Sequence, residues 1–182
     1  MTKAEIRKDA LILRNSLKEK LALDKKIYTL LTSSDFYKSA KTVMCYLSFG
    51  SEVDTKEIVT ALLADKKTVC APRCLKNSIM EAVKFDSLSE LSPGDYGILT
   101  PSGEEVINPK DIDLIIVPGA AFNKKFHRIG YGKGYYDRFL AKTNALSCGL
   151  FYEFQQIDFT EDMYDIPLNY IITENKIYKN EE

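Results

Sequence analysis

Three glycines at alternate positions lie inside a basic and aromatic segment of the chain. The segment is AFNKKFHRIGYGKGYYDRFL, residues 121–140, and its glycines run from Gly130 to Gly134. Because glycine has no Cβ, the backbone can turn its N–H groups toward a ligand that approaches closely. Arg128 and Lys133 add full positive charge, and arginine can hold a phosphate through two parallel hydrogen bonds. The segment therefore predicts a phosphate-binding cradle, with a tight structural turn as the alternative.

The glycine pattern matches neither of the common nucleotide motifs. A P-loop needs four residues between its glycines and then Gly-Lys-Ser/Thr, and the chain lacks this arrangement. The dinucleotide fingerprint needs a third glycine where Tyr135 stands. The expectation of phosphate binding depends instead on the glycines, the nearby charges and the start of a following helix.

A carboxylate follows the glycines directly. Mg²⁺ is typically held by one or two carboxylates together with phosphate oxygens, so Asp137 is a candidate metal ligand. Alternatively, Asp137 favours the start of the following helix or pairs with Lys133 or Arg138. Tyr135 and Tyr136 could stack on a flat heterocycle or pack in the core, and we expect one to point inward and one outward.

Apolar strands that alternate with amphipathic helices must position this segment. Leu114–Val117 is continuously apolar, which is typical of a strand buried on both faces. Further strands are predicted at residues 42–47, 68–72, 79–85, 146–152 and 169–173, and residues 92–105 are predicted as a loop. The alternation predicts an α/β fold, a three-layer α/β/α sandwich with a mostly parallel sheet. Ligands of such sheets bind beyond the C-terminal ends of the strands, where the glycine segment follows.

The first helix carries two stripes of side chains. Thr2 and Glu5 have the spacing of a capping box. At 3.6 residues per turn we expect an apolar stripe of Ile6, Ala10, Leu13 and Leu17, beside a basic stripe of Lys3, Arg7, Arg14 and Lys18. Taken alone, the basic stripe is typical of a solvated face. Later helices are predicted through residues 24–31 and over residues 55–67, the second with Asp54 as its N-cap.

Length and composition limit the class of protein. A chain of 182 residues fits one domain, residues 1–182, and a net charge of -1 argues against nucleic acid as a partner. No apolar run approaches the roughly 20 residues of a membrane span, and the first residues do not resemble a signal peptide. We expect a cytoplasmic monomer that acts on small molecules.

The four cysteines are predicted to be buried reduced thiols. They are Cys45, Cys70, Cys74 and Cys148. A zinc site would need paired short spacings, and the chain offers one histidine only.

The ordered motifs resemble those of the 5-formyltetrahydrofolate cyclo-ligase family, also called methenyltetrahydrofolate synthetases. VPGAAF followed by RIGYGKGYYDRFL is similar to the family's signature. Lys3, Arg7 and Arg14 resemble its opening helix, YLSFGSEVDT its first strand with a Glu-bearing loop, and MYDIPLNYIIT its Asp-bearing C-terminal segment.

The resemblance implies an ATP-dependent enzyme that converts 5-formyltetrahydrofolate into 5,10-methenyltetrahydrofolate, with Mg²⁺ as cofactor and ADP and phosphate as products. The γ-phosphoryl group would pass to the formyl oxygen, because phosphate is a far better leaving group than a formamide oxygen. The second nitrogen of the folate would then attack the activated carbon and close the ring. Catalysis would be mainly positioning and charge stabilisation.

The resemblance also assigns roles to residues. Arg128 and Lys133 would stabilise transferring charge, Asp137 and Asp165 would hold Mg²⁺, and Glu52 would accept hydrogen bonds from the pterin edge. The residues implied for ATP are Lys3, Arg7, Arg128, Ile129, Gly130, Tyr131, Gly132, Lys133, Gly134, Tyr135 and Tyr136. Those implied for the folate are Leu47, Glu52, Tyr131, Gly132, Lys133, Gly134 and Tyr135.

Three positions depart from the family's pattern. Asn123 stands where aspartate is common, Phe126 where glycine is common, and Tyr164 where histidine is frequent. A phenylalanine at position 126 is expected to restrict the start of the loop. Two other functions remain open from the residues alone: a phosphate-binding module of similar fold without ligase chemistry, and a nucleic-acid binder that uses the basic loop.

Overall fold

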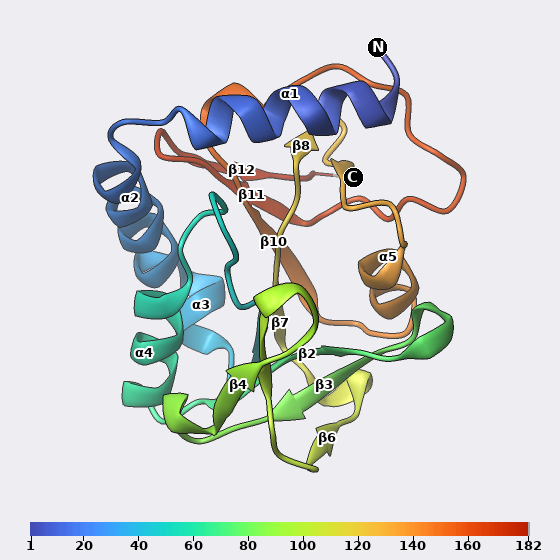
Figure 1. The fold of residues 1–182 in the computed structure, drawn as a ribbon. Helices are drawn as coiled ribbons and strands as arrows, with labels where there is room; N and C mark the ends of the chain where they lie inside the picture. Colours follow the sequence, from blue (N-terminus) through green and yellow to red (C-terminus); the bar gives the residue numbers. More distant parts are fainter. Residues whose placement is uncertain (182) are drawn as a thin grey trace.

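The computed structural model describes residues 1–181, which fold around a sheet of eight strands (Figure 1). The strand order is β12-β11-β10-β7-β1-β2-β3-β6. Five neighbouring strands are parallel: β11 (Tyr170–Ile172), β10 (Leu146–Leu150), β7 (Leu114–Val117), β1 (Thr42–Cys45) and β2 (Thr68–Cys74). The outer strands pair antiparallel: β12 (Ile177–Lys179) with β11 at one edge, and at the other end β3 (Met80–Lys84) with β2 and β6 (Val106–Ile107) with β3. The prediction of a mostly parallel sheet is confirmed.

Side chains of the central strands alternate between two apolar layers. Leu114 and Ile116 of β7 pack toward α2 (Lys20–Ser33), α3 (Asp35–Ser39) and α4 (Lys56–Ala64). Ile115 and Val117 pack on the other face, toward α5 (Tyr135–Leu140). Because a strand buried on both faces has no solvent side, β7 is apolar at every position. The three-layer arrangement is confirmed (Figure 1).

Helix α1 (Lys3–Asn15) packs on the short hairpin of β8 (Ala121–Phe122) and β9 (Arg128–Ile129). Figure 1 shows α1 lying across the end of the molecule, above β8. The predicted capping box of Thr2 and Glu5 is confirmed. Its contact face brings Ile6 and Ala10 against Ala120, Ala121 and Ile129.

The predicted stripes of α1 need two corrections. The third buried side chain is Arg14, while Leu13 is 49% exposed, because the sequence Ile6, Ala10, Arg14 follows the helix at intervals of four residues. The helix also ends at Asn15, so Leu17 and Lys18 lie beyond it and extend neither the apolar nor the basic stripe.

Several other elements differ from their predicted extents. The N-cap of α4 is Thr55, while Asp54 accepts a hydrogen bond from the amide of Lys56 at 2.9 Å. The predicted loop of residues 92–105 contains most of a hairpin of β4 (Leu91–Pro93) and β5 (Leu99–Pro101). Single-turn helices are η1 (Lys76–Ser78), η2 (Leu88–Glu90), η3 (Asp95–Gly97), η4 (Pro109–Asp111) and η5 (Glu153–Gln155).

The cysteines confirm their prediction at three positions of four. Cys45, Cys70 and Cys148 are fully buried, and all four thiols are free. Cys74 is exposed, because it ends β2 beyond the buried part of the strand.

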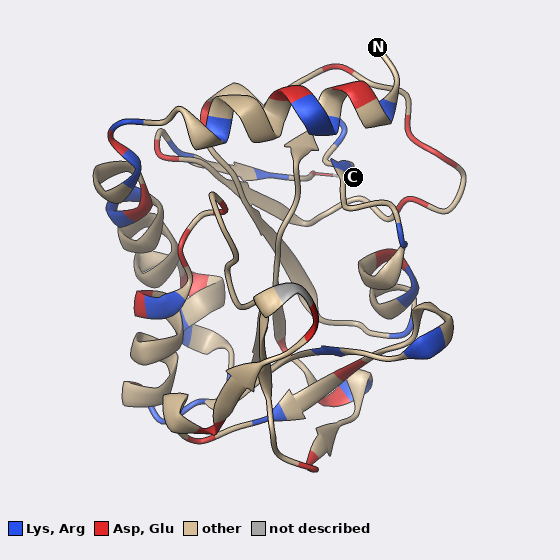
Figure 2. Ribbon diagram, in the orientation of Figure 1, with Lys and Arg blue, Asp and Glu red and all other residues tan. Residues whose placement is uncertain are grey.

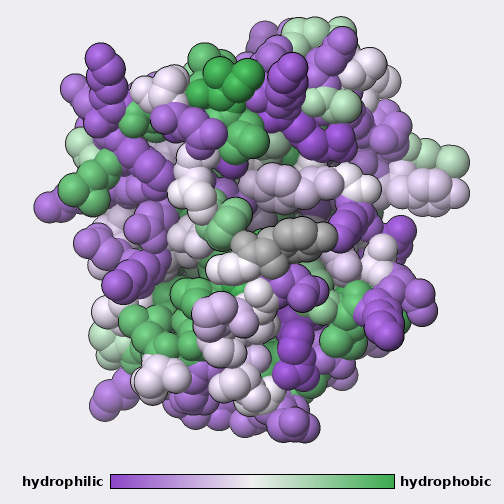
Figure 3. All heavy atoms as spheres, viewed as in Figure 1, coloured by the Kyte–Doolittle hydropathy of each residue, from purple (hydrophilic) through white to green (hydrophobic). Residues whose placement is uncertain are grey.

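Charge is mixed over the molecule. Lys/Arg and Asp/Glu are interspersed on the elements (Figure 2), and hydrophilic side chains cover most of the face in Figure 3, with smaller hydrophobic patches between them. Among residues 1–181, each helix is too short or too polar to cross a lipid bilayer.

Candidate active site

The glycine segment, residues 130–134, joins β9 to α5. Gly132 and Gly134 have φ angles of 91° and 65°, the left-handed region that side chains disfavour. Within residues 1–181, the amides of Gly130, Tyr131, Gly132 and Gly134 donate no hydrogen bond to the protein. The segment therefore offers a run of open N–H donors.

The surroundings of this segment differ from the prediction in two respects. The hairpin of β8 and β9 separates the glycines from β7, so they do not follow that strand directly. Helix α5 has six residues, and the dipole of so short a helix adds little positive charge.

Helix α1 supplies one wall of the site. Arg7 donates from Nε to the carbonyl of Gly130 at 2.6 Å, and a Cβ on Gly132 would lie 3.6 Å from its Nη2. Lys3 pairs through Nζ with Asp162 at 2.7 Å and Asp165 at 2.6 Å. Burial opposes the charge of Lys3, but these two partners raise its pKa overall. Both predicted cations thus lie beside the glycines or beside a predicted metal ligand.

Arg128 and Asp137 form the most enclosed ion pair of the site. Nη1 of Arg128 lies 2.9 Å from Oδ1 of Asp137, and only 3% of the Arg128 side chain is exposed. The guanidinium also stands 5.6 Å from the centre of the Tyr136 ring, within range of a cation–π interaction. Burial raises the pKa of the Tyr136 hydroxyl well above its ordinary value, so it stays protonated.

The two predicted metal ligands come from distant parts of the chain to one place. Oδ1 of Asp137 accepts a hydrogen bond from the amide of Ile166 at 3.1 Å, and Ile166 adjoins Asp165. No hydrogen bond in the described residues reaches Oδ2 of Asp137 or Oδ1 of Asp165. Each carboxylate therefore keeps an open oxygen, the ligand type that Mg²⁺ prefers.

These carboxylates do not form a complete protein cage for a metal. Residues 1–181 contain no group of three or more His, Cys, Asp and Glu side chains with the arrangement of a metal site. Mg²⁺ usually takes one or two carboxylates and completes its shell with water and phosphate oxygens. Asp137 and Asp165 fit that pattern of partial ligation.

Glu52 lies on the loop after β1 and is almost fully buried, at 8% exposure. Its Oε1 accepts the hydroxyl of Tyr131 at 2.5 Å, and its Oε2 accepts the amide of Phe49 at 2.8 Å. The ring of Tyr131 is mostly exposed, while its hydroxyl is enclosed between Glu52 and Arg14. Desolvation of the hydroxyl and the charge of Glu52 raise the pKa of Tyr131 to about 12. The glycine segment is thereby tied to the Glu52 loop.

The remaining predicted residues occupy different environments. Ile129 is buried against α1, and Lys133 is exposed, with its carbonyl accepting from Arg138 at 2.7 Å. Leu47 is buried in the apolar cluster that also contacts Tyr136. Tyr135 donates to the carbonyl of Leu75 at 3.3 Å, toward the turn between β2 and β3. Both tyrosines are half-buried as whole residues, but the hydroxyl of Tyr136 is buried between the apolar clusters and that of Tyr135 lies at an exposed position, in agreement with one inward and one outward side chain.

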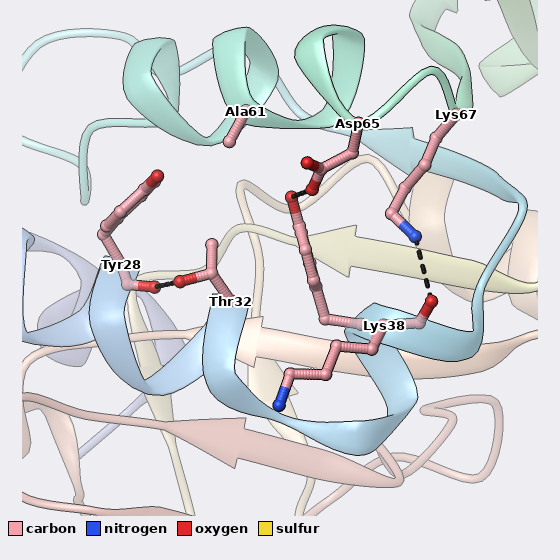
Figure 4. A pocket seen from close by; sticks show the side chains of 7 residues that line it. Tyr28, Thr32, Lys38, Ala61, Asp65 and Lys67 are labelled. Atoms are coloured by element: carbon pink, nitrogen blue, oxygen red, sulfur yellow. Dashed lines mark hydrogen bonds between the residues drawn. The ribbon is translucent and has the colours of Figure 1, made fainter.

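A hollow of about 340 Å³ adjoins the glycine segment. Its lining residues are Ala4, Arg7, Lys8, Leu11, Arg14, Ala120 and Tyr131, so its charged side chains are all cationic. A larger hollow of about 530 Å³ lies among α2, α3 and α4 (Figure 4). There Asp65 accepts the hydroxyl of Tyr37 at 2.9 Å and Lys67 donates to backbone carbonyls. Because those charges are already satisfied and no predicted residue lies there, the smaller hollow is the one that belongs to the site.

Comparison with known proteins identifies the family of the chain. The model of the 5-formyltetrahydrofolate cyclo-ligase family matches residues 1–174, which is nearly the whole chain. The chain belongs to this family.

Relatives of the family share both sequence and fold with the chain. A probable 5-formyltetrahydrofolate cyclo-ligase of Schizosaccharomyces pombe is 30% identical over 163 residues, 79% of this chain and 80% of that protein. The structure of 5,10-methenyltetrahydrofolate synthetase from Aquifex aeolicus is similar with a TM-score of 0.88 and 33% identity, covering 100% of this chain and 94% of that one. The synthetase from Mycoplasma pneumoniae gives 0.79 and 27%, with coverage of 96% and 99%.

Two departures from the family's pattern have a structural account. Phe126 has a φ of 64°, a conformation that glycine adopts readily, and its half-buried ring packs on the second apolar cluster. Asn123 accepts the amides of Lys125 and His127 through Oδ1, as an aspartate could. Its Nδ2 also donates to the carbonyl of Phe159 at 3.2 Å, which an aspartate could not do. Tyr164 is exposed, and nothing in the structure explains its replacement of histidine.

Sequence reasoning missed the contacts of Arg14 and Asp162 with predicted site residues. The spacing of Arg14 from Ile6 and Ala10 was the available signal, since it places the guanidinium on the buried face of α1. Asp162 shares Lys3 with Asp165, and nothing in the sequence distinguishes it from its acidic neighbours.

Proposed function

We propose that the protein converts 5-formyltetrahydrofolate into 5,10-methenyltetrahydrofolate and consumes ATP with Mg²⁺. Membership of the cyclo-ligase family supports the overall reaction. One structural observation supports the chemistry: open backbone amides, three cations and two partly free carboxylates surround a single glycine segment. This is the set of groups that phosphoryl transfer needs, because the reaction requires mainly positioning and neutralisation of charge.

The ATP phosphates would bind between α1 and the glycine segment. The open amides of Gly130, Tyr131, Gly132 and Gly134 would donate to phosphate oxygens, and the side chains of Lys3, Arg7 and Lys133 would supply positive charge. Arg128 lies behind the segment, and its Nε has no partner in the described residues, so part of its donor capacity is unused. Its role would be to hold Asp137 and to stabilise the negative charge of the transferring group.

Asp137 and Asp165 would hold Mg²⁺ through their open oxygens. The ion would neutralise phosphate charge and orient the phosphoryl group for transfer. The structure pairs these carboxylates with Arg128 and Lys3.

The folate would lie on the other side of the segment, against Glu52 and the exposed ring of Tyr131. A carboxylate has about four acceptor positions, and Tyr131 and Phe49 use two of those on Glu52. The others would accept the amino and ring N–H groups of the pterin. Leu47 would support this pocket from the core.

The reaction would proceed in two displacements. The formyl oxygen attacks the γ-phosphorus, so a new P–O bond forms while the bond to ADP breaks. The second folate nitrogen then donates its lone pair to the activated carbon and loses its proton. The C–O bond breaks, and its electrons leave with phosphate as the ring closes.

The experiment is incubation of the protein with 5-formyltetrahydrofolate, ATP and Mg²⁺, followed by near-ultraviolet absorbance. We expect the methenyl chromophore to appear only when all three are present. Absence of the chromophore from folded protein that binds ATP would contradict the proposal. A phosphate-binding module without ligase activity would instead show ATP binding by calorimetry and no folate binding.

We also infer that the protein acts in the cytoplasm as a monomer on small molecules, without nucleic acid. Residues of both charges are interspersed along the helices, strands and loops, which does not favour a polyanionic partner (Figure 2). Light scattering of the purified protein would test the monomer directly.

A further inference from the structure

Arg14 is a buried cation without a carboxylate partner. It occupies the third position of the face through which α1 packs, after Ile6 and Ala10, and is 5% exposed. Within the described residues it forms no salt bridge. Burying a guanidinium is costly, and a leucine at this position would pack without that cost. The packing of α1 therefore does not by itself account for an arginine here.

The contacts of Arg14 lead to the site. Its Nη1 donates to the carbonyl of Gly119 at 3.3 Å, just after the end of β7. Its Nη2 donates to the hydroxyl oxygen of Tyr131 at 3.4 Å. A guanidinium can only donate, so the hydroxyl hydrogen of Tyr131 has to point elsewhere, and it points to Glu52. Arg14 thus makes the Tyr131 hydroxyl the donor in its hydrogen bond with Glu52.

We infer that Arg14 is a positioning residue for the folate: it orients the Tyr131 hydroxyl as a donor to Glu52, and so fixes the carboxylate that receives the pterin. The inference rests on the proposed role of Glu52 in folate binding. With Tyr131 on Oε1 and the Phe49 amide on Oε2, the carboxylate is held at both oxygens. A carboxylate held in this way presents its remaining acceptor positions in one orientation.

Two arginines attach α1 to the glycine segment through different groups, although both line the hollow of about 340 Å³. Arg7 holds the backbone carbonyl of Gly130, beside the amides proposed for phosphate. Arg14 holds the side chain of Tyr131, beside the carboxylate proposed for the pterin. Arg14 is only 5% exposed, and its Nη1 and Nη2 already donate to Gly119 and Tyr131, so its loss should affect folate much more than ATP. A residue that only stabilised α1 would affect both substrates, since Lys3 and Arg7 lie on the same helix.

The first test is the Arg14→Met variant, which keeps the length of the side chain and removes its donors. We expect the KM for 5-formyltetrahydrofolate to rise about tenfold, the effect of one hydrogen bond to a charged group. The KM for ATP should change less than about twofold. Lys18→Met is the matched control, because Lys18 is an exposed cation from the same predicted stripe and contacts neither Tyr131 nor Glu52. A rise of both KM values by the same factor would overturn the inference.

The second test is a double-mutant cycle with Tyr131→Phe, which keeps the ring and removes the hydroxyl. If Arg14 acts through that hydroxyl, Tyr131→Phe should raise the folate KM similarly, and the double variant should be no worse than Tyr131→Phe alone. If the folate KM of the double variant rose by the product of the two single-variant factors, the inference would be overturned. Should Arg14→Met fail to fold, Tyr131→Phe alone decides, since an unchanged folate KM would show that the hydroxyl does not position Glu52.

Measurement of wild-type turnover separates this inference from the proposed function. If the wild-type protein forms no methenyl product, the proposed function fails and the role of Arg14 in folate binding fails with it. If the wild-type protein is active but Arg14→Met changes the KM for 5-formyltetrahydrofolate and the KM for ATP by the same factor, only the role of Arg14 fails. Rescue of the folate KM by Arg14→Lys would support the need for a donor at this position.

Discussion

At the scale of residues, both proposed metal ligands are already paired with cations. Arg128 balances Asp137, and Lys3 balances Asp165, at distances of 2.9 Å and 2.6 Å. The same four side chains are proposed to bind phosphate and Mg²⁺. Entry of the metal–nucleotide complex would then exchange partners: the carboxylates would turn to the metal and the cations to phosphate. Such an exchange avoids leaving any of the four charges buried and unpaired.

Asp137→Asn tests the metal role of the carboxylate. The amide oxygen can still accept the hydrogen bond from Ile166, so the local fold should persist. A neutral amide binds Mg²⁺ more weakly, and we expect the Mg²⁺ concentration for half-maximal activity to rise at least about tenfold, a loss of roughly 1.4 kcal/mol. Titration of activity with Mg²⁺ measures this. The exposed Asp9→Asn serves as control, and an unchanged titration for Asp137→Asn would count against its assignment.

At the scale of elements, the hairpin of β8 and β9 determines where the glycine segment begins. Its turn is closed by the amide of Phe126, which donates to the carbonyl of Asn123 at 3.0 Å, and by the left-handed backbone of Phe126. The carbonyl of Phe126 also accepts the amide of Leu168 at 2.9 Å, which joins the turn to the segment after Asp165. The unusual phenylalanine is therefore part of the connection between the proposed ligand-bearing segments.

Two substitutions at Phe126 distinguish how its left-handed backbone and its packed ring affect the free energy of unfolding. Both Phe126→Ala and Phe126→Gly lose the half-buried ring and should destabilise the protein. Glycine alone relieves the positive φ, so we expect the glycine variant to be more stable than the alanine variant by about 1 kcal/mol. Urea unfolding of the two variants measures the difference. Greater stability of the alanine variant would show that position 126 is not left-handed.

The sequence predicted the strongly periodic elements well and the hairpin not at all. Leu114–Val117 is recognisable because a continuous apolar run between turn residues is typical of a buried strand. Strands β8 and β9 have two residues each, which is too short for any periodicity. Their existence depends on pairing with each other and on contact with α1, and neither is visible in a local pattern. For the same reason the sequence could propose Arg128 and Asp137 as site residues but could not pair them.

At the scale of the whole molecule, the sheet holds three thiols that have to stay protonated. Burial raises the pKa of Cys70 to about 12, and burial raises the pKa of Cys45 and Cys148 as well. The ordinary value for an unfolded thiol is about 8.5. The folded protein thus retains protons that the unfolded chain loses, so this contribution to stability is complete below about pH 8.5 and declines as the pH rises.

Alkaline unfolding checks this account. Between about pH 8.5 and 9.5, each buried thiol should lower the free energy of unfolding by up to about 1.4 kcal/mol per pH unit. Cys70→Ala should reduce that slope by one such contribution, although it lowers stability at neutral pH through lost packing. Urea titrations in reductant give the slope. Val69→Ala is the control, because it removes buried packing from the same strand without removing a proton, and an equal slope in wild type and Cys70→Ala would contradict the account.

The assembly of the site is also a property of the whole molecule. Lys3 and Arg7 come from the first helix, Glu52 from the loop after β1, Asp137 from α5, and Asp165 from the segment before β11. Contacts between distant parts of the chain link them in steps: Arg7 donates to Gly130, Glu52 accepts from Tyr131, Asp137 accepts from the amide beside Asp165, and Asp165 pairs with Lys3. That the whole chain works as one domain stays a prediction, as do the roles of the individual residues.

An experiment that follows the formyl oxygen most directly tests the central claim, which is transfer of the γ-phosphoryl group to that oxygen. The protein would be supplied with ATP, Mg²⁺ and 5-formyltetrahydrofolate carrying ¹⁸O in the formyl group, and the released phosphate would be analysed by mass spectrometry. Transfer of the γ-phosphoryl group to that oxygen predicts one ¹⁸O atom in each phosphate, in proportion to the methenyl product formed. Unlabelled phosphate, with the ¹⁸O recovered in water, would contradict the account.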